Sequence, residues 1–231
     1  MEKFIYEIPT KVYFGEGQII GLKEEVKKYG TRLLLVYGGN SIKRNGIYES
    51  ITKLLDEAGV ELWEESGVQP NPKITSVERG VRTCREHDIQ MVLAVGGGSC
   101  IDCAKAIAAG ACSESEPWNL VLHSEMIQKV LPIMCVVTLA ATGSEMDGIA
   151  VINNPTTNEK RPMKHPKLRP SVAVLDPTYT YSVPKYQTAA GTADIMSHLM
   201  ETYFSRHEGY MQARMEEALM KTCIHYGPIA M

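Results

Sequence analysis

The chain has 231 residues, of which 44% are hydrophobic and 22% charged, and a formal net charge of −3. This composition is typical of a soluble globular protein, and so small a charge gives no reason to expect binding to nucleic acid or to an anionic membrane. The N-terminal segment mixes charged and apolar residues, unlike a signal peptide, and the longest apolar run, near residues 133–141, is too short to cross a bilayer. The six cysteines are therefore expected to be reduced thiols of a cytoplasmic protein.

Strand-like and helix-like segments alternate along the first two thirds of the chain. Strands are predicted at residues 31–37, 60–64, 91–95 and 133–138, and helices at residues 47–58, 73–87 and 99–109. This alternation predicts an α/β fold, a parallel sheet with helices on both faces. Three strand ends are followed by Gly, Ser, Thr or Asn. Because ligands of such sheets lie beyond the carboxyl ends of the strands, we expect a nucleotide site there.

The most informative segment reads MVLAVGGGSCIDCAK and covers residues 91–105. A buried strand runs into Gly96, Gly97 and Gly98, and a helix begins near Ser99. Uncovered amide groups and the positive end of a helix dipole favour a phosphate or pyrophosphate at such a turn, although the spacing is not G-x-G-x-x-G. The alternative is a turn without a ligand, in which Ser99 and Asp102 form a capping box.

Cys100 and Cys103 form a C-x-x-C motif within this helix. The motif is compatible with redox or zinc chemistry, but no second cysteine pair stands at the spacing of a zinc site. We therefore interpret the two cysteines as small packing residues.

The chain changes character in its last third. Strands are predicted at residues 149–153 and 171–175, and the proline-rich segment between them is not expected to be helical. Long helical patterns follow at residues 186–204 and 210–225, the second expected to end at Gly227-Pro228. The predicted division is an α/β dinucleotide-binding domain over residues 1–183 and an incomplete helical domain over residues 184–231.

The second of these helices has an apolar face that needs a partner. We expect the chain to lack the rest of its helical domain, because so few residues follow the boundary. The alternative is that the two helices pack back on the α/β domain or on another subunit.

Asp194 and His198 stand four residues apart in the first of the long helical patterns. This spacing places a carboxylate and an imidazole on one helix face, from which they can bind one divalent cation. Two ligands do not make a site, and an Asp–His contact on a solvated face is the commoner arrangement.

Taken together, these segments resemble the iron-containing (group III) alcohol dehydrogenase family, and within it the NADPH-dependent butanol dehydrogenase and aldehyde reductase branch. The matching stretches are residues 37–43 (YGGNSIK), 69–72 (QPNP), 96–99 (GGGS) with Asp102 and Lys105, 138–145 (TLAATGSE), 175–177 (LDP) and 189–198 (AAGTADIMSH).

The resemblance implies a nucleotide domain, an all-helical metal domain and an active site in the cleft between them. It implies Fe²⁺ or Zn²⁺ bound by Asp194, His198 and two later histidines, which have no counterpart here. It also implies a cofactor site. The implied cofactor contacts are Gly38, Gly39, Asn40, Ser41, Asn71, Gly96, Gly97, Gly98, Ser99, Asp102, Thr138, Leu139, Thr142, Ser144, Lys160, Tyr179 and Val183.

Gly39, Asn40 and Ser41 stand where the family reads the adenosine ribose. An acidic residue there would favour NAD by binding the 2′-hydroxyl, but the turn has none, and Lys43 and Arg44 follow it. The sequence therefore predicts NADP(H) over NAD(H). Residues 147–149 (DGI) depart from what relatives often carry near the cofactor.

The expected activity is metal-dependent hydride transfer between NADP(H) and a primary alcohol or aldehyde, such as butanol or butyraldehyde, in a homodimer. No side-chain acid for catalysis is evident. One alternative is a truncated nucleotide-binding remnant without turnover. Another is an enzyme of the same fold, of the dehydroquinate synthase or glycerol dehydrogenase type. A lyase of the first type would use basic residues, for which Lys164, His165, Lys167 and Arg169 are candidates.

Overall fold

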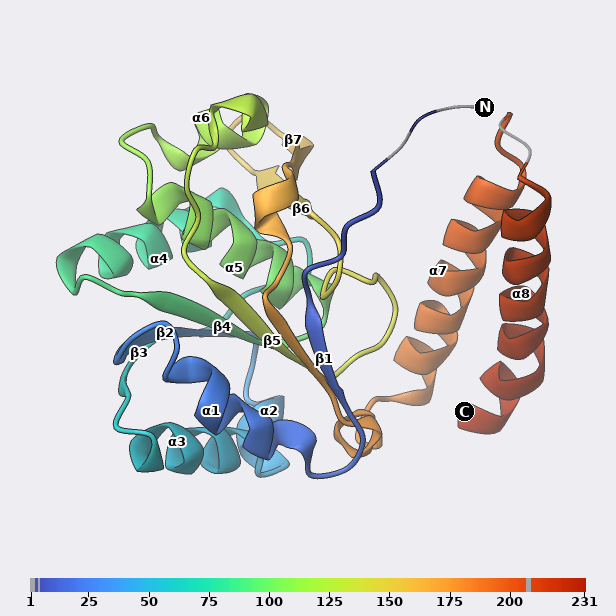
Figure 1. Cartoon of the computed structure of the whole chain (residues 1–231), viewed down its shortest axis with the longest axis horizontal. Helices are drawn as coiled ribbons and strands as arrows, with labels where there is room; N and C mark the ends of the chain where they lie inside the picture. The colour runs from blue at the N-terminus through green and yellow to red at the C-terminus, as the bar shows by residue number, and fades with distance from the viewer. Residues whose placement is uncertain (1–2, 4, 207–208) are drawn as a thin grey trace.

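The computed structural model describes residues 3, 5–206 and 209–231, and at its centre is a six-stranded parallel sheet (Figure 1). The order of the strands in the sheet is β1-β8-β5-β4-β2-β3. Their bounds are β1 Lys11–Phe14, β2 Arg32–Tyr37, β3 Glu61–Glu65, β4 Met91–Gly96, β5 Ile133–Val137 and β8 Val172–Leu175. Two more strands, β6 (Ile149–Asn154) and β7 (Glu159–Lys164), form a separate antiparallel hairpin.

Helices cover both faces of this sheet because its central strands are apolar on both sides. In β2, Leu34 and Val36 belong to one buried cluster, and Leu33 and Leu35 belong to the other. The helices are α1 Leu22–Val26, α2 Ser41–Arg44 and α3 Ile47–Glu57 on one face, and α4 Ile74–Glu86, α5 Gly98–Ala111 and α6 Pro117–Leu122 on the other. Continuous apolar strands are the mark of a sheet buried on two sides, so the predicted α/β fold is confirmed.

The strand β1 and the helices α1 and α6 had no prediction from the sequence. β1 is a four-residue edge strand with mostly exposed side chains, so its sequence shows neither an apolar run nor alternation. It joins the sheet because its backbone pairs with β8. Only the tertiary fold brings these two segments together.

The proline-rich segment contains no α-helix within residues 155–170, all of which the structure describes, as expected. It instead forms β7 and a single turn of 3₁₀ helix, Pro166–Leu168. Pro162 is tolerated within β7 because this strand is an edge of a two-stranded hairpin.

The last two helices, α7 (Lys185–Tyr203) and α8 (Tyr210–Ala230), pack on each other beside the α/β body (Figure 1). The expected end at Gly227-Pro228 is wrong, because α8 continues through Pro228 to Ala230. Pro184 is the N-cap of α7, and the division into domains at that point stays a prediction. Within the part of the chain that the structure describes, no helix is both long and apolar enough to cross a membrane.

Candidate functional site

A cleft of about 500 Å³ lies at the carboxyl edge of the sheet, beyond the ends of β2, β4 and β5. This is the edge at which parallel α/β sheets bind ligands. The lining residues are Gly38, Gly39, Ser41, Ile42, Asn45, Val68, Pro70, Val95, Gly96, Gly97, Gly98, Ser99, Cys100, Thr138, Leu139, Tyr179, Ser182, Val183, Pro184 and Gln187. None of these described lining residues is an Asp, Glu, Lys or Arg, so the cleft offers backbone amides, hydroxyls and apolar surface.

The three glycines at the end of β4 are required by close packing as well as by any ligand. Gly96 has a φ of +155°, and a Cβ there would lie 2.5 Å from Cys100 Sγ. A Cβ on Gly98 would lie 2.6 Å from Thr142 Oγ1. Larger residues would therefore collide with α5 or with the loop after β5, whether or not a nucleotide is bound.

The capping box that the alternative interpretation placed at Ser99 and Asp102 does not form. The N-cap of α5 is Gly97, and it makes no side-chain capping bond. Ser99 Oγ instead accepts from the backbone N–H of Asn71 at 3.3 Å. The N–H groups of Cys100 and Ile101 donate to the Gly97 carbonyl at 3.0 and 3.3 Å. The N–H groups of Gly98 and Ser99, two residues that line the cleft, have no capping side chain to compete with a ligand.

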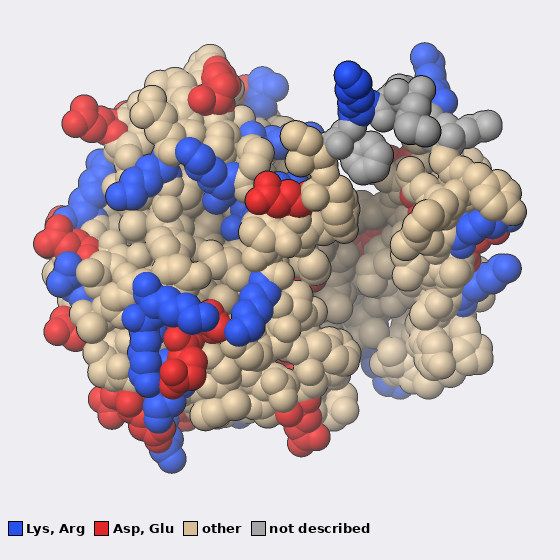
Figure 2. All heavy atoms as spheres, in the orientation of Figure 1, with Lys and Arg blue, Asp and Glu red and all other residues tan. Residues whose placement is uncertain are grey.

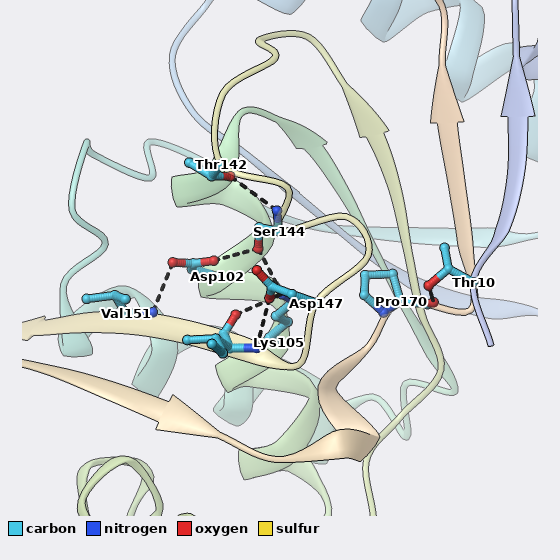
Figure 3. Close-up of polar contacts among 9 residues, drawn as sticks. Thr10, Asp102, Lys105, Thr142, Ser144, Asp147, Val151 and Pro170 are labelled. Carbon is cyan, nitrogen blue, oxygen red and sulfur yellow. Dashed lines mark hydrogen bonds and ion pairs between the residues drawn. The ribbon is translucent and has the colours of Figure 1, made fainter. Parts of the chain in front are cut away.

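Asp102 lies behind the glycine turn and joins the loop after β5 to the hairpin (Figure 3). Its carboxylate accepts from Ser144 Oγ at 2.7 Å and from the backbone N–H of Val151 at 2.9 Å. Ser144 N–H in turn donates to Thr142 Oγ1 at 3.2 Å. Burial raises the pKa of the Asp102 carboxyl, and these hydrogen bonds only partly offset it.

Lys160 on β7 reaches back toward the glycine turn. Its Nζ donates to Asn71 Oδ1 at 2.7 Å, and Asn71 is the residue whose N–H binds Ser99. Asn71 has a φ of +55°, in the left-handed region that asparagine tolerates better than most residues. The hairpin and the segment after β3 therefore meet beside the first turn of α5.

The acidic side chain of Glu64, in β3, lies near the turn after β2 and was not among the predicted site residues. Glu64 accepts hydrogen bonds from the hydroxyls of Tyr37 and Tyr48. Burial would raise the pKa of Glu64, but these two hydrogen bonds and nearby Lys43 hold it below its ordinary value. Lys43 Nζ lies 4.4 Å from the centre of the Tyr48 ring. The carboxylate is thus already occupied by protein donors.

Burial of the C-x-x-C pair favours the packing interpretation. Both cysteines are buried in α5, and burial raises the pKa of Cys100 to about 12 and that of Cys103 well above its ordinary value. Redox-active thiols need a lowered pKa, which neither residue has.

The structure brings eleven of the seventeen predicted cofactor residues into the lining of the cleft. They are Gly38, Gly39, Ser41, Gly96, Gly97, Gly98, Ser99, Thr138, Leu139, Tyr179 and Val183. Six others, Asn40, Asn71, Asp102, Thr142, Ser144 and Lys160, lie outside it. The lining also has Gln187, from the first turn of α7, and Cys100. Cys100 was within a recognised motif, but no local signal marks Gln187, which only the docking of α7 brings to the cleft.

Asp194 and His198 lie one turn apart on α7, with Asp194 Oδ1 3.9 Å from His198 Nε2. Their side chains are 44% and 52% exposed, so both are free to turn toward a shared cation. Asp194 is about 10 Å along the helix axis from Gln187 at the cleft. Among the described residues, no group of three or more His, Cys, Asp and Glu side chains could hold a metal ion. This chain therefore offers two donors of the right chemistry, not a full coordination shell.

The family model described as iron-containing alcohol dehydrogenase matches residues 9–177. The chain belongs to the iron-containing alcohol dehydrogenase family. The resemblance that the sequence motifs predicted is thereby confirmed.

Two relatives illustrate this similarity. The chain is 57% identical over 232 residues to NADH-dependent butanol dehydrogenase A of Clostridium acetobutylicum, a match that covers 100% of this chain and 60% of that protein. It is 37% identical over 235 residues to NADPH-dependent aldehyde reductase YqhD of Escherichia coli, with coverage of 100% and 60%.

Solved structures of the family have the same fold over nearly the whole chain. NADH-dependent butanol dehydrogenase A of Thermotoga maritima superposes with a TM-score of 0.95 at 39% identity, over 99% of this chain and 57% of that one. The substrate- and cofactor-free form of YqhD gives a TM-score of 0.90 at 35% identity, over 99% and 59%. The chain thus spans about 60% of the length of the curated relatives it matches.

Proposed function

We propose that the chain binds a pyridine nucleotide in the cleft and takes part in hydride transfer between that nucleotide and a primary alcohol or aldehyde, such as butanol or butyraldehyde. The observation that carries the proposal is the coincidence of two findings. The family match covers residues 9–177, and eleven residues that the family resemblance assigns to the cofactor line one cleft at the carboxyl edge of the sheet.

The cleft suits a dinucleotide that is held by neutral groups. Amides at the start of α5 can donate to the pyrophosphate, and the helix dipole supplies partial positive charge. Ser99, Thr138 and Ser182 add hydroxyls to the lining. Val68, Leu139 and Val183 add apolar surface, against which the rings of the nucleotide can pack and be oriented.

Asp194 and His198 would supply two of the ligands of Fe²⁺ or Zn²⁺. Carboxylate oxygen and imidazole nitrogen suit both metals, and their 3.9 Å separation on adjacent turns allows them to converge. When bound, the cation would polarise the carbonyl oxygen and the nicotinamide would exchange the hydride. The role of α7 is to hold these two donors at a set distance from the cleft that its first turn lines.

We propose NADP(H) as the preferred cofactor. The turn after β2 has no acidic residue to bind a 2′-hydroxyl, and the nearby Glu64 carboxylate is occupied by two tyrosine hydroxyls. Lys43 adds positive charge close by. The rival is NAD(H), because the relatives at 57% and 55% identity are named NADH-dependent. A lower KM for NADPH than for NADH supports the proposal, and a clear NADH preference refutes it.

One rival function has an observation in its favour, namely a nucleotide-binding chain without turnover. Among the described residues, no group of three or more His, Cys, Asp and Glu side chains could hold a metal ion, so Asp194 and His198 are an incomplete ligand set. The lyase alternative has no such support. Lys167 and Arg169 line a different hollow near Ile133, at the amino edge of the sheet, where the cleft does not reach.

Three measurements on the purified chain test the proposal: NADPH binding by fluorescence titration, metal content, and NADPH oxidation with butyraldehyde. Binding with metal-dependent oxidation supports it. Binding with neither metal nor turnover supports the chain without turnover instead. Failure to bind either NADPH or NADH overturns both. A homodimer and a cytoplasmic location stay predictions, of which sedimentation velocity tests the first and cell fractionation the second.

A further inference from the structure

Lys105 is a fully buried lysine behind the glycine turn, with an exposed fraction of 0%. All three N–H donors of its ammonium are used (Figure 3). They donate to Ser144 Oγ, Asp147 Oδ1 and the backbone oxygen of Ile149, each at 2.8 Å. Two acceptors belong to the loop between β5 and β6, and the third begins β6, so one side chain of α5 ties down the far end of that loop.

That loop lies between the glycine turn and α7. Its first residue, Thr138, lines the cleft and donates its N–H to the carbonyl of Gly96. In the middle of the loop, Thr142 lies close to Gly98, because a Cβ added to Gly98 would lie 2.6 Å from Thr142 Oγ1. On its other side, a Cβ on Gly191 of α7 would lie 2.9 Å from the carbonyl oxygen of Ala140. The position of the loop therefore determines both one wall of the cleft and the surface against which α7 packs.

A second residue of α5 strengthens the same attachment. Asp102, one turn before Lys105, accepts from the Ser144 hydroxyl that Lys105 contacts. Asp147 Oδ1 also accepts from the backbone N–H of Ile149. The ammonium and the two carboxylates thus form one connected network in which every donor of Lys105 has a partner.

Stability alone does not account for a charge at this position. A buried ion pair often contributes no more than a well-packed apolar side chain of the same volume, because desolvation offsets the attraction. Methionine has nearly the volume of lysine and could fill the same space, but it would leave the oxygens of Ser144, Asp147 and Ile149 without the donors that Lys105 supplies. Directional bonds, unlike apolar contacts, fix where the loop lies.

We propose that Lys105 is a positioning residue for the nucleotide cleft. It fixes the loop of residues 138–148 so that Thr138 and Leu139 can contact the nucleotide and α7 stays at a set distance from the cleft. This inference rests on the proposed function. Lys105 is not assigned a contact with the cofactor, and its effect passes through Ser144 and Asp147.

The test is Lys105→Met in the full chain, with NADPH fluorescence as the readout. We expect the Kd for NADPH to rise about tenfold, the size of coupling found within one hydrogen-bonded network, and the bound emission to shift back toward that of free NADPH. Hydrogen exchange of the amides of residues 138–148 should accelerate in the protein without nucleotide. Asp147→Asn is the milder variant, because the Asp147 side chain is 41% exposed, and it tests the network even if Lys105→Met does not fold.

A double variant and a matched control separate positioning from loss of stability. If the two residues act through one network, Lys105→Met with Asp147→Asn should weaken NADPH binding no more than Lys105→Met alone. Glu25→Gln is the control, because it breaks another network, in which Lys11, Lys28 and Tyr13 donate to a buried carboxylate away from the cleft. It should lower the melting temperature and leave the Kd unchanged.

The outcomes are distinct. Unchanged NADPH affinity in Lys105→Met, or in Asp147→Asn if the first variant does not fold, overturns the inference. So does an equal loss of affinity in Glu25→Gln, because the effect would then follow stability. If the unsubstituted chain binds neither NADPH nor NADH, the proposed function fails and this inference falls with it. If it binds NADH but not NADPH, the same variants are compared by their Kd for NADH. If the unsubstituted chain and Lys105→Met bind NADPH equally well, this inference is overturned while the proposed function stands.

Discussion

The α/β body and the α7–α8 pair differ in how completely each buries its own apolar surface. The body has two large buried clusters, one on each face of its sheet. In the described part of the helical pair only Gly191, Glu216 and Gly227 are buried, and on the face in Figure 2 a furrow separates the pair from the body. Apolar side chains of α8, among them Met211, Met215 and Leu219, are exposed.

This difference bears on the two halves of the proposed site. The cleft is formed almost entirely by the body, whose packing supports its walls. The two metal donors lie on α7, which buries little of its own surface and approaches the body closely near Ala140. The nucleotide half is therefore expected to form independently of the metal half. Three predictions test that separation, and a fourth concerns the body alone.

The largest expected effect is on stability. Leu93 in β4 is fully buried, and Leu219 in α8 is 51% exposed. Leu93→Ala should lower the free energy of unfolding by about 2–5 kcal/mol through lost burial and a cavity. Leu219→Ala should change it by less than about 0.5 kcal/mol. Urea unfolding measures both. Equal losses would mean that the helical pair shares the core of the body after all.

The next effect is on the cleft. Gly98→Val would place a Cβ 2.6 Å from Thr142 Oγ1, so the loop after β5 must move. Overpacking of this kind costs about 1–3 kcal/mol, and we expect NADPH to bind about ten- to a hundredfold more weakly by fluorescence titration. Gly80→Ala is the control, because it collides with Ile107 away from the cleft. It should reduce stability and leave the NADPH affinity intact.

A smaller effect concerns acid stability within the body. Burial would raise the pKa of Glu25, but hydrogen bonds from Lys11, Lys28 and Tyr13 lower it to about 2. The stability it contributes is present above its unfolded pKa of 4.5 and is lost as the pH falls toward 2. Glu25→Gln should cost about 1 kcal/mol at pH 7 and less at pH 3. A cost that does not shrink between the two pH values would contradict this assignment.

The smallest expected effect on the body comes from the metal donors. Asp194→Ala and His198→Ala remove exposed side chains, so the melting temperature and the NADPH Kd should stay as they are. Zn²⁺ or Fe²⁺ binding, measured by titration and metal analysis, should fall. Glu201→Ala, another exposed acid on α7, should have no effect on metal binding. A drop in NADPH affinity in the first two variants would join the two regions that we treat as separate.

Particular residues mark where sequence reasoning succeeded. The run from Met91 to Val95 predicted a buried strand, and β4 is that strand, because continuous apolar residues suit a sheet covered on both sides. The same reasoning failed at β1, whose side chains are mostly exposed and whose place depends on pairing with β8. At Ser99 and Asp102 the alternative capping box does not form, because longer-range partners bind both side chains.

The amino-acid sequence by itself determined the alternation of strands and helices, the glycine turn and the pairing of Asp194 with His198 on one helix face. These features follow from periodicity, backbone freedom and spacing, which act over a few residues. Only the tertiary structure decided that Asp102 and Lys105 turn inward to the loop after β5, that Glu64 is occupied by two tyrosines, and that Gln187 reaches the cleft. Each depends on contacts between segments far apart in the chain, where a hydrogen bond or a close approach outweighs local preference.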